Sequence, residues 1–235
     1  MLNRVLRQWP ACVAFGLATG IKAFYSHAGA DELLWVLAPS AWLARFAGGI
    51  DLVYEQGAGF ISHTHHMVVG PPCAGVNFLV IGFLCLYFSF ARRVPGKARW
   101  LLYSALISFA GTIAANGLRI VVSARLWNAD IYGGGMTPDL VHRFVGITIY
   151  YASLLSIYFV VDSRIGQRAP TMAPLAWYLG ISLGIPLAGR VYGEAPAGFA
   201  AHAAWVMTVA LLLTLIYWLV KALPYARRNR LHCKS

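Results

Sequence analysis

Charged residues are scarce in this chain, and acidic residues are the scarcest of all. Only 11% of the 235 residues are charged, with 8 Asp and Glu against 19 Lys and Arg, whereas 59% are hydrophobic. A soluble domain carries roughly 25% charged residues. The apolar excess is grouped in runs that approach the ~20 residues a helix needs to span a bilayer. The sequence therefore predicts an integral membrane protein and excludes an ordinary soluble domain.

Other signals are missing as well. There is no internal repeat, no low-complexity segment, and no nucleotide-binding or haem signature, so we expect no cofactor. The apolar run after Trp9 lacks a small-residue cleavage site, and we expect it to be retained as a first helix. The net charge of +11 lies in short loops between apolar runs. That placement is typical of membrane orientation, so we expect no nucleic-acid partner.

Six apolar stretches predict an all-α, polytopic transmembrane helix bundle that forms a single membrane domain over residues 1–235. They are residues 9–26, 74–90, 100–122, 139–161, 172–190 and 199–221. A seventh stretch, 33–50, is interrupted by Pro39 and carries Arg45. These two residues favour a short re-entrant or interfacial element over another crossing. Downstream of it, residues 51–70 predict a small hairpin or an ordered loop over the helix ends.

The basic residues predict which side of the membrane each loop occupies. Thirteen Lys and Arg residues lie in 1–8, 91–99, 162–171 and 221–235, against one acid, Asp162. Cytoplasmic loops are enriched in Lys and Arg. We therefore expect both termini to be cytoplasmic and the region 27–72 to lie outside.

Cysteines are few, and one of the four stands apart from the rest. By the predicted topology, Cys12 and Cys85 lie within helices and Cys233 lies in the cytoplasmic tail. Cys73 is then alone near the outer surface, without an obvious disulfide partner. Two prolines precede it and predict that Cys73 opens the second helix, where free backbone N–H groups and the helix dipole favour a thiolate. The alternative is a small buried apolar residue.

Two other polar residues are predicted at the same depth as Cys73. Arg119 lies in the last turns of the third helix, and Asn116 shares its face. Arg119 is suited to holding a thiolate or an oxyanion, or alternatively to reaching the lipid headgroups. His142 lies about one turn into the fourth helix, after the predicted N-cap Thr137, and suits a general base and acid. Its alternative is an interfacial histidine bonded to a neighbour.

Consecutive antiparallel helices bring Cys73, Arg119 and His142 to one face of the membrane. A cysteine, a histidine and an arginine at one depth form the set that a cysteine nucleophile needs.

Two further groups of residues have a simpler interpretation. His63, His65 and His66 could bind a transition metal, but no nearby acid or second cysteine completes a site, so we expect no metal. The aromatic residues Tyr150, Tyr151, Trp127, Trp177 and Trp205 are interpreted as helix packing and interfacial belts.

At these residues the sequence resembles the exosortase/archaeosortase family of polytopic membrane proteins. The family has a Cys in a C-[AS]-G context, an N-x-x-R motif at a helix end and a His that opens a later helix. Here these are Cys73-Ala74-Gly75, Asn116-Gly117-Leu118-Arg119 and His142, in the same order. The P-x-C-A-G-x-N-F form, which includes Asn77, is similar to the exosortase K subtype. The resemblance covers roughly residues 31–161, although many exosortases have more crossings than predicted here.

The resemblance implies a membrane cysteine peptidase/transpeptidase of the bacterial cytoplasmic (inner) membrane. Its substrates would be exported proteins that carry a C-terminal sorting signal, made of a short motif, a transmembrane helix and a basic tail. Cys73 would attack the peptide carbonyl at the outer face and form a thioester. His142 would transfer protons, and Arg119 would stabilise the thiolate or the oxyanion. Supporting residues would be Gly75, Asn77, Asn116 and Asp139.

Two other classes of protein remain as alternatives. A transporter or channel would line a polar path with Arg119 and His142, and its polar residues would be spread across the bilayer depth. A non-catalytic envelope assembly subunit would not bring Cys73, Arg119 and His142 together. The substrate, the acceptor, the oligomeric state and the balance between hydrolysis and transfer do not follow from the sequence.

Overall fold

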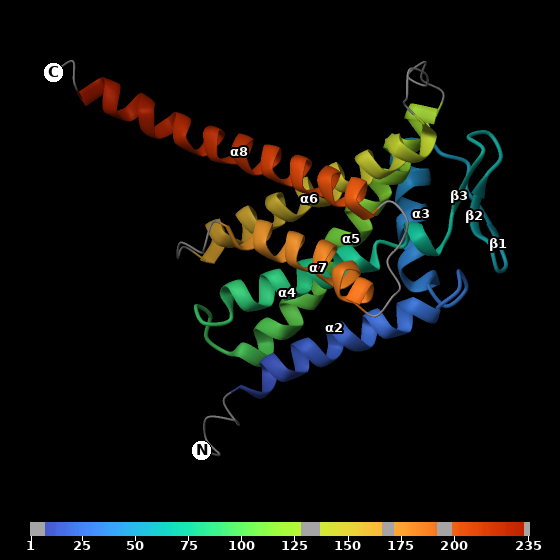
Figure 1. Cartoon of the computed structure of the whole chain (residues 1–235), viewed down its shortest axis with the longest axis horizontal. Coiled ribbons are helices and arrows are strands. Elements are labelled where there is room, and N and C mark those ends of the chain that lie inside the picture. The colour runs from blue at the N-terminus through green and yellow to red at the C-terminus, as the bar shows by residue number, and fades with distance from the viewer. Residues whose placement is uncertain (1–7, 128–136, 166–171, 192–198, 233–235) are drawn as a thin grey trace. The chain divides into compact units, whose positions relative to one another are not determined.

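The protein is described by a computed structural model, which covers residues 8–127, 137–165, 172–191 and 199–232. For residues 138, 139, 188–191 and 220–232 only the backbone is described. Each of the six stretches predicted to be helical contains a helix, as Figure 1 shows. The α-helices are α2 (Trp9–His27), α3 (Leu34–Gly48), α4 (Val76–Phe90), α5 (Lys97–Trp127), α6 (Pro138–Ile165), α7 (Ala173–Val191) and α8 (Phe199–His232).

The chain divides into two compact units, Met1–Trp177 and Tyr178–Ser235, with the boundary inside α7. The first unit holds α2 to α6 together with a small β-sheet. The second holds most of α7 and all of α8. Every residue of the predicted catalytic set lies in the first unit.

Four helices are long and apolar enough to cross a membrane. The spans are Pro71–Phe90, Lys97–Trp127, Leu140–Ile165 and Phe199–Leu219. Of the other two predicted crossings, α2 has 19 residues but is less apolar than these four. The apolar part of α7, Ala173–Leu187, is shorter. By length and composition, four of the six predicted stretches are therefore able to cross a membrane, as expected of a membrane protein.

Helix α4 lies at the centre of the first unit. Of the apolar stretch within Pro71–Phe90 that contains α4, 83% is buried. It runs antiparallel to α2, since the rings of Phe15 and Phe88 lie 4.9 Å apart at one end and Lys22 bonds Asn77 at the other. On its other side α4 packs against α5. A glycine allows that approach, because a Cβ on Gly82 would lie only 3.3 Å from the Ser108 hydroxyl.

Helix α3 follows the second half of α5. Trp35 stacks on Phe109 at 5.8 Å, and Leu43 covers Gly117, where a Cβ would lie 2.8 Å from Leu43. The predicted interruption at Pro39 was wrong, because α3 continues through this residue as one 15-residue helix. At 1.5 Å per residue it is about 22 Å long, shorter than the ~30 Å hydrocarbon layer. Its length agrees with the expectation that 33–50 is not a full crossing.

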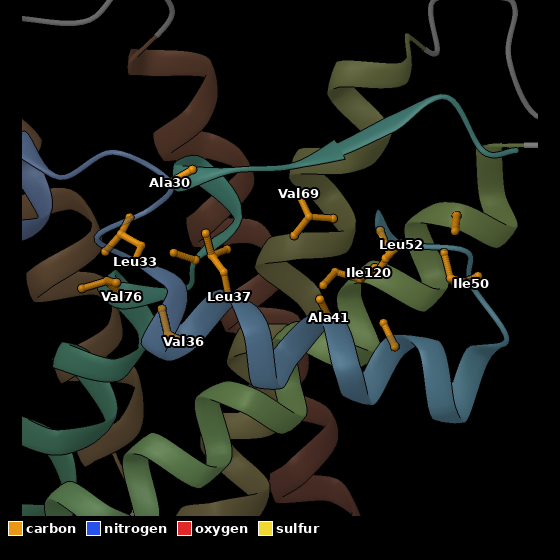
Figure 2. Close-up of a cluster of buried hydrophobic side chains, with 13 residues drawn as sticks. Ala30, Leu33, Val36, Leu37, Ala41, Ile50, Leu52, Val69, Val76 and Ile120 are labelled. Atoms are coloured by element: carbon orange, nitrogen blue, oxygen red, sulfur yellow. The ribbon is translucent and has the colours of Figure 1, made fainter. Parts of the chain in front are cut away.

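The predicted hairpin region forms a three-stranded antiparallel sheet beside α3 (Figure 1). Its strands are β1 (Val53–Glu55), β2 (Gly59–Ser62) and β3 (Met67–Val69), in the order β1-β2-β3. A cluster of buried apolar side chains ties the sheet to the helices. Figure 2 shows Val69 of β3 pointing toward Ile120 of α5, with Leu52 and Leu37 close by. The segment between α3 and α4 is therefore an ordered cover over one end of the helices.

Candidate active site

Cys73 ends a short 3₁₀ turn, Pro71–Cys73, that connects β3 to α4. The prediction that Cys73 opens the helix was wrong in detail, because α4 begins at Val76. Its backbone N–H bonds the carbonyl of Gly70 at 2.8 Å, and its side chain is partly exposed. The two prolines favour this tight turn, since their φ angles suit it and they have no N–H to satisfy. Cys73 is thus held by a rigid turn that precedes α4.

Asn116 of α5 fixes the backbone of Cys73 from the side. Its amide Nδ2 donates to the Cys73 carbonyl at 2.8 Å. Between the turn and α4, Gly75 adopts a φ of +71°, and a Cβ there would lie 3.0 Å from the Asn116 amide. Glycine is therefore required at 75 both by its left-handed backbone and by the close approach of Asn116. The predicted supporting residues Gly75 and Asn116 act together to place Cys73.

Tyr150 of α6 joins Asn116 to Arg119. The Arg119 guanidinium donates through Nη1 to the Tyr150 hydroxyl at 2.9 Å, and this hydroxyl donates to Asn116 Oδ1 at 2.5 Å. The interpretation of Tyr150 as simple packing or belt was therefore incomplete, although its ring does stack on Phe78 at 5.1 Å. The sequence did hold a signal that Tyr150 belongs to the site: Tyr150 lies eight residues after His142, on the same face of the helix.

Arg119 also contacts His142 directly. Its Nη2 lies 2.5 Å from His142 Nε2. A guanidinium has only donors, so Nε2 must be the acceptor. This geometry requires a neutral His142 whose ring proton is on Nδ1. Gly146, one turn later on α6, makes room for the guanidinium, since a Cβ there would lie 3.1 Å from Arg119 Nε.

The expected N-terminus of α6 is confirmed. Pro138 is the first helical residue, and the Thr137 hydroxyl accepts the N–H of Leu140 at 3.3 Å. This cap places His142 about one turn into the helix, as predicted. The side chain of Asp139 lies outside the described residues, so its supporting role stays a prediction.

Cys73, Arg119 and His142 line one small cavity. The cavity measures about 10 Å³, which is roughly the room one water molecule needs. A Cys73 thiolate would also lie close enough to interact electrostatically with Arg119. The remaining lining comes from Asn116, Ile120 and Ser123 of α5 and from Met67 and Val69 of β3. The structure thus brings together three residues that lie as much as 69 positions apart along the chain.

Asn77 takes a different position from the other predicted residues. Its side chain is exposed and does not line the cavity. It accepts a hydrogen bond of 2.8 Å from Lys22 of α2. Lys22 was not singled out from the sequence, and its only signal was a lysine inside an apolar run.

The histidine cluster belongs to the sheet. Asp51 accepts hydrogen bonds from the hydroxyls of Ser62 and Thr64, and His65 Nδ1 lies 3.2 Å from its Oδ1. The Ser62 and Thr64 hydroxyls hold the pKa of the Asp51 carboxyl well below its usual range. His63, which directly follows β2, has its Nε2 3.8 Å from a carboxylate oxygen of Glu55 at the end of β1. Within the described ranges no three His, Cys, Asp or Glu side chains are grouped to hold a metal ion.

The chain has no significant match among models of protein families, curated proteins or solved structures. The chemistry of the site therefore has to be inferred from its own geometry. A thiol, an imidazole and a fixed guanidinium around one cavity can supply a nucleophile, a proton carrier and a donor for an oxyanion. The Asn116 amide holds the backbone of Cys73 in place, and the Tyr150 phenol holds the Arg119 guanidinium.

Proposed function

We propose that the protein is a membrane-embedded cysteine peptidase or transpeptidase. The observation that carries this proposal is that Cys73, Arg119 and His142 line one cavity and that Asn116 and Tyr150 hold Cys73 and Arg119. The resemblance to exosortases at these motifs supports the same reaction class. On that basis the substrates are exported proteins with a C-terminal sorting signal.

The reaction would proceed in two halves. Cys73 Sγ attacks a peptide carbonyl carbon, a C–S bond forms, and the thiol proton passes to His142 Nε2. Arg119 Nη2, which now occupies Nε2, turns to donate to the developing oxyanion. The C–N bond then breaks, and His142 protonates the departing amine. In the second half an acceptor amine or water attacks the thioester, gives its proton to His142, and restores the Cys73 thiol.

The proposal includes a location for the site. We infer that α2 and α7 cross the membrane together with the four helices that are long and apolar enough, which gives six crossings. We also infer that both termini are cytoplasmic. The excess of Lys and Arg in 91–99 and 162–171 supports this orientation. It places the cavity at the outer face of the bacterial inner membrane, where exported substrates arrive.

One observation favours the transporter alternative. Polar residues on α5 are buried along the helix, not only at the end that carries Asn116 and Arg119. Ser104, Ser108 and Thr112 are buried below Asn116, one turn apart. Thr112, however, bonds a carbonyl of its own helix, and Ser108 packs against Gly82 of α4. Small hydroxyl residues commonly allow such close helix packing.

The reactivity of Cys73 tests the proposed function. The protein would carry Cys73 alone, with Cys12, Cys85 and Cys233 replaced, and a membrane-impermeant thiol reagent would be applied from outside. An ordinary thiol is only a few per cent ionised at pH 7. If Arg119 and His142 activate Cys73 as the proposed function requires, the labelling rate at pH 7 should approach the rate at pH 9.5. Arg119→Ala should lower this rate ratio several-fold.

Matched controls separate the site from general effects. Arg125→Ala removes another α5 arginine, whose Nη2 donates to the Gly48 carbonyl, and should leave the ratio unchanged. Likewise His142→Ala should change the ratio, whereas the exposed His27→Ala should not. A Cys73 that reacts as an ordinary thiol, indifferent to Arg119 and His142, would refute the catalytic assignment.

A further inference from the structure

The cavity beside Cys73 is far too small for a peptide, so the way a substrate reaches the thiol depends on what borders it. Two residues of β3, Met67 and Val69, form part of its lining. Val69 is completely buried and points toward Ile120 (Figure 2), whereas Val68 between them is 56% exposed. Strand β3 therefore has one face toward the site and one face away from it.

The hydrogen-bonding register of β3 follows from its pairing with β2. The partners are Phe60 with Val69, Ile61 with Val68, and Ser62 with Met67. The Val69 carbonyl oxygen faces β2, since it lies 2.5 Å from where a Gly59 Cβ would be. In an antiparallel pair, residues alternate between bonding the partner and pointing away from it. Val68 is thus the residue whose N–H and C=O both point away from β2.

Nothing in the described part of the chain satisfies these two groups. In the sheet order β1-β2-β3, strand β3 is an edge. Outside the ladder with β2, neither the N–H nor the C=O of Val68 has a backbone hydrogen bond to another described residue. An edge residue with a free donor and a free acceptor is a template for a further strand.

We propose that an extended peptide segment of the substrate adds to the edge of β3 by pairing with Val68. This inference rests on the proposed function and deepens it, because it states how the substrate is held. A substrate segment is the expected occupant because the edge of β3 is continuous with the site: Met67 and Val69, the two neighbours of Val68, line the cavity of Cys73. Main-chain hydrogen bonds give such strand addition its affinity, and pockets for alternate side chains give its specificity.

The geometry also fixes which substrate side chains face the cavity. The residue paired with Val68 has its side chain on the Val68 face, and its two neighbours turn toward Met67 and Val69. Only small side chains fit there unless Met67, which is unbranched and adaptable, moves aside.

Val68→Pro tests the pairing with little effect on the sheet itself. Proline is tolerated where an edge N–H faces away from the ladder, and a residue before proline prefers the extended conformation that Met67 already has. Val68→Ala is the matched control, because it shortens the side chain but keeps the N–H. Both variants would be made in full-length protein with Cys73 as the sole cysteine.

The probes would be two electrophiles that alkylate Cys73 with loss of chloride. One is chloroacetamide, which has no peptide, and the other is acetyl-alanyl-alanyl-alanine chloromethyl ketone. We expect Val68→Pro to lower the ratio of the tripeptide rate to the chloroacetamide rate by about ten-fold, the worth of one or two backbone hydrogen bonds. Val68→Ala should keep the ratio within about two-fold. The same ratio in both variants would overturn strand addition.

A second measurement tests the pairing of the peptide with Val68 without relying on the reactivity of Cys73. In Cys73→Ser protein, amide hydrogen exchange at Val68 would be followed with and without saturating acetyl-trialanine amide. Slower exchange at Val68 with the tripeptide supports the pairing, and unchanged exchange overturns it. If chloroacetamide fails to label Cys73 while exchange is slowed, the proposed catalytic function fails and the peptide site stands.

Discussion

Single hydrogen bonds decide how the candidate site is assembled. Cys73 is placed by its backbone, through the Asn116 amide, rather than through contacts to its sulfur. Arg119 is oriented by two acceptors, the Tyr150 hydroxyl and His142 Nε2. When Nη2 leaves His142 to donate to an oxyanion, the Tyr150 contact at Nη1 can remain, and this anchor limits the freedom that the guanidinium loses.

Tyr150→Phe isolates the contribution of the bridging hydroxyl. The change leaves an Arg119 donor and the Asn116 carbonyl oxygen without their partner, and such losses cost about 1–3 kcal/mol each in a buried setting. We expect a lower thermal unfolding temperature and slower pH 7 labelling of Cys73. Tyr103→Phe, at an exposed position of α5, is the control and should change neither measurement. An unaltered labelling rate in Tyr150→Phe would show that the bridge does not orient Arg119.

At the scale of elements, the β-sheet borders the site through Met67 and Val69 of β3. Two aspartates secure the sheet at its turns. Asp31 accepts the Tyr54 hydroxyl and the Gly57 N–H, and Asp51 accepts the hydroxyls of Ser62 and Thr64. The Gly57 N–H and the Tyr54 hydroxyl lower the pKa of the Asp31 carboxyl, just as the hydroxyls lower that of Asp51.

The order of the sheet should therefore depend on pH. A carboxyl whose pKa is lower in the folded state stabilises that state above its unfolded pKa, about 3.9 for Asp, and the stabilisation is lost as the pH falls. At pH 7 we expect Asp51→Asn to speed amide hydrogen exchange in residues 59–69 relative to the wild-type protein. Near pH 2.5 this difference should narrow, because the Asp51 carboxyl of the opened sheet is then protonated and the opened state gains stability relative to the folded one.

The comparison at equal pH removes the intrinsic pH dependence of exchange. Residues 100–110 of α5, remote from Asp51 in the chain, serve as an internal reference. A difference between Asp51→Asn and wild type that is the same at both pH values would mean that the charge of Asp51 does not hold the turn.

At the scale of the whole molecule, orientation in the membrane determines what the site can act on. The loop between α4 and α5 and the turn between β2 and β3 are separated by the span Pro71–Phe90. If the basic loops are cytoplasmic, His63 is outside and Arg92 is inside. Both positions are exposed, so substitutions there should not disturb the fold.

Single cysteines test this orientation directly. In a background without the four native cysteines, an impermeant reagent should label His63→Cys in intact cells. It should label Arg92→Cys only after the membrane is permeabilised. A reporter fused before Met1 should be cytoplasmic if α2 crosses. Labelling of both cysteines from the same side would contradict the crossing by α4.

Much of this protein could be predicted from local features of its chain. The run lengths and hydropathy of residues 74–90, 100–122 and 139–161 predict helices, because a membrane span requires nothing beyond its own apolar residues and backbone hydrogen bonds. The cap formed by Thr137 and Pro138 is equally local. From the order of these helices, the meeting of Cys73, Arg119 and His142 at one end followed without any knowledge of packing.

Tertiary structure alone decided the rest. The role of Tyr150, the continuity of α3 through Pro39 and the free edge of β3 depend on contacts between residues that are distant in the chain. Tyr150 and Asn116 are 34 positions apart, and Asn116 and Cys73 are 43 apart. Hydropathy and spacing set where a helix forms. How each helix is rotated against its neighbours depends on how side chains fill the space between them, as Asn116 and Arg119 fill the space left free at Gly75 and Gly146.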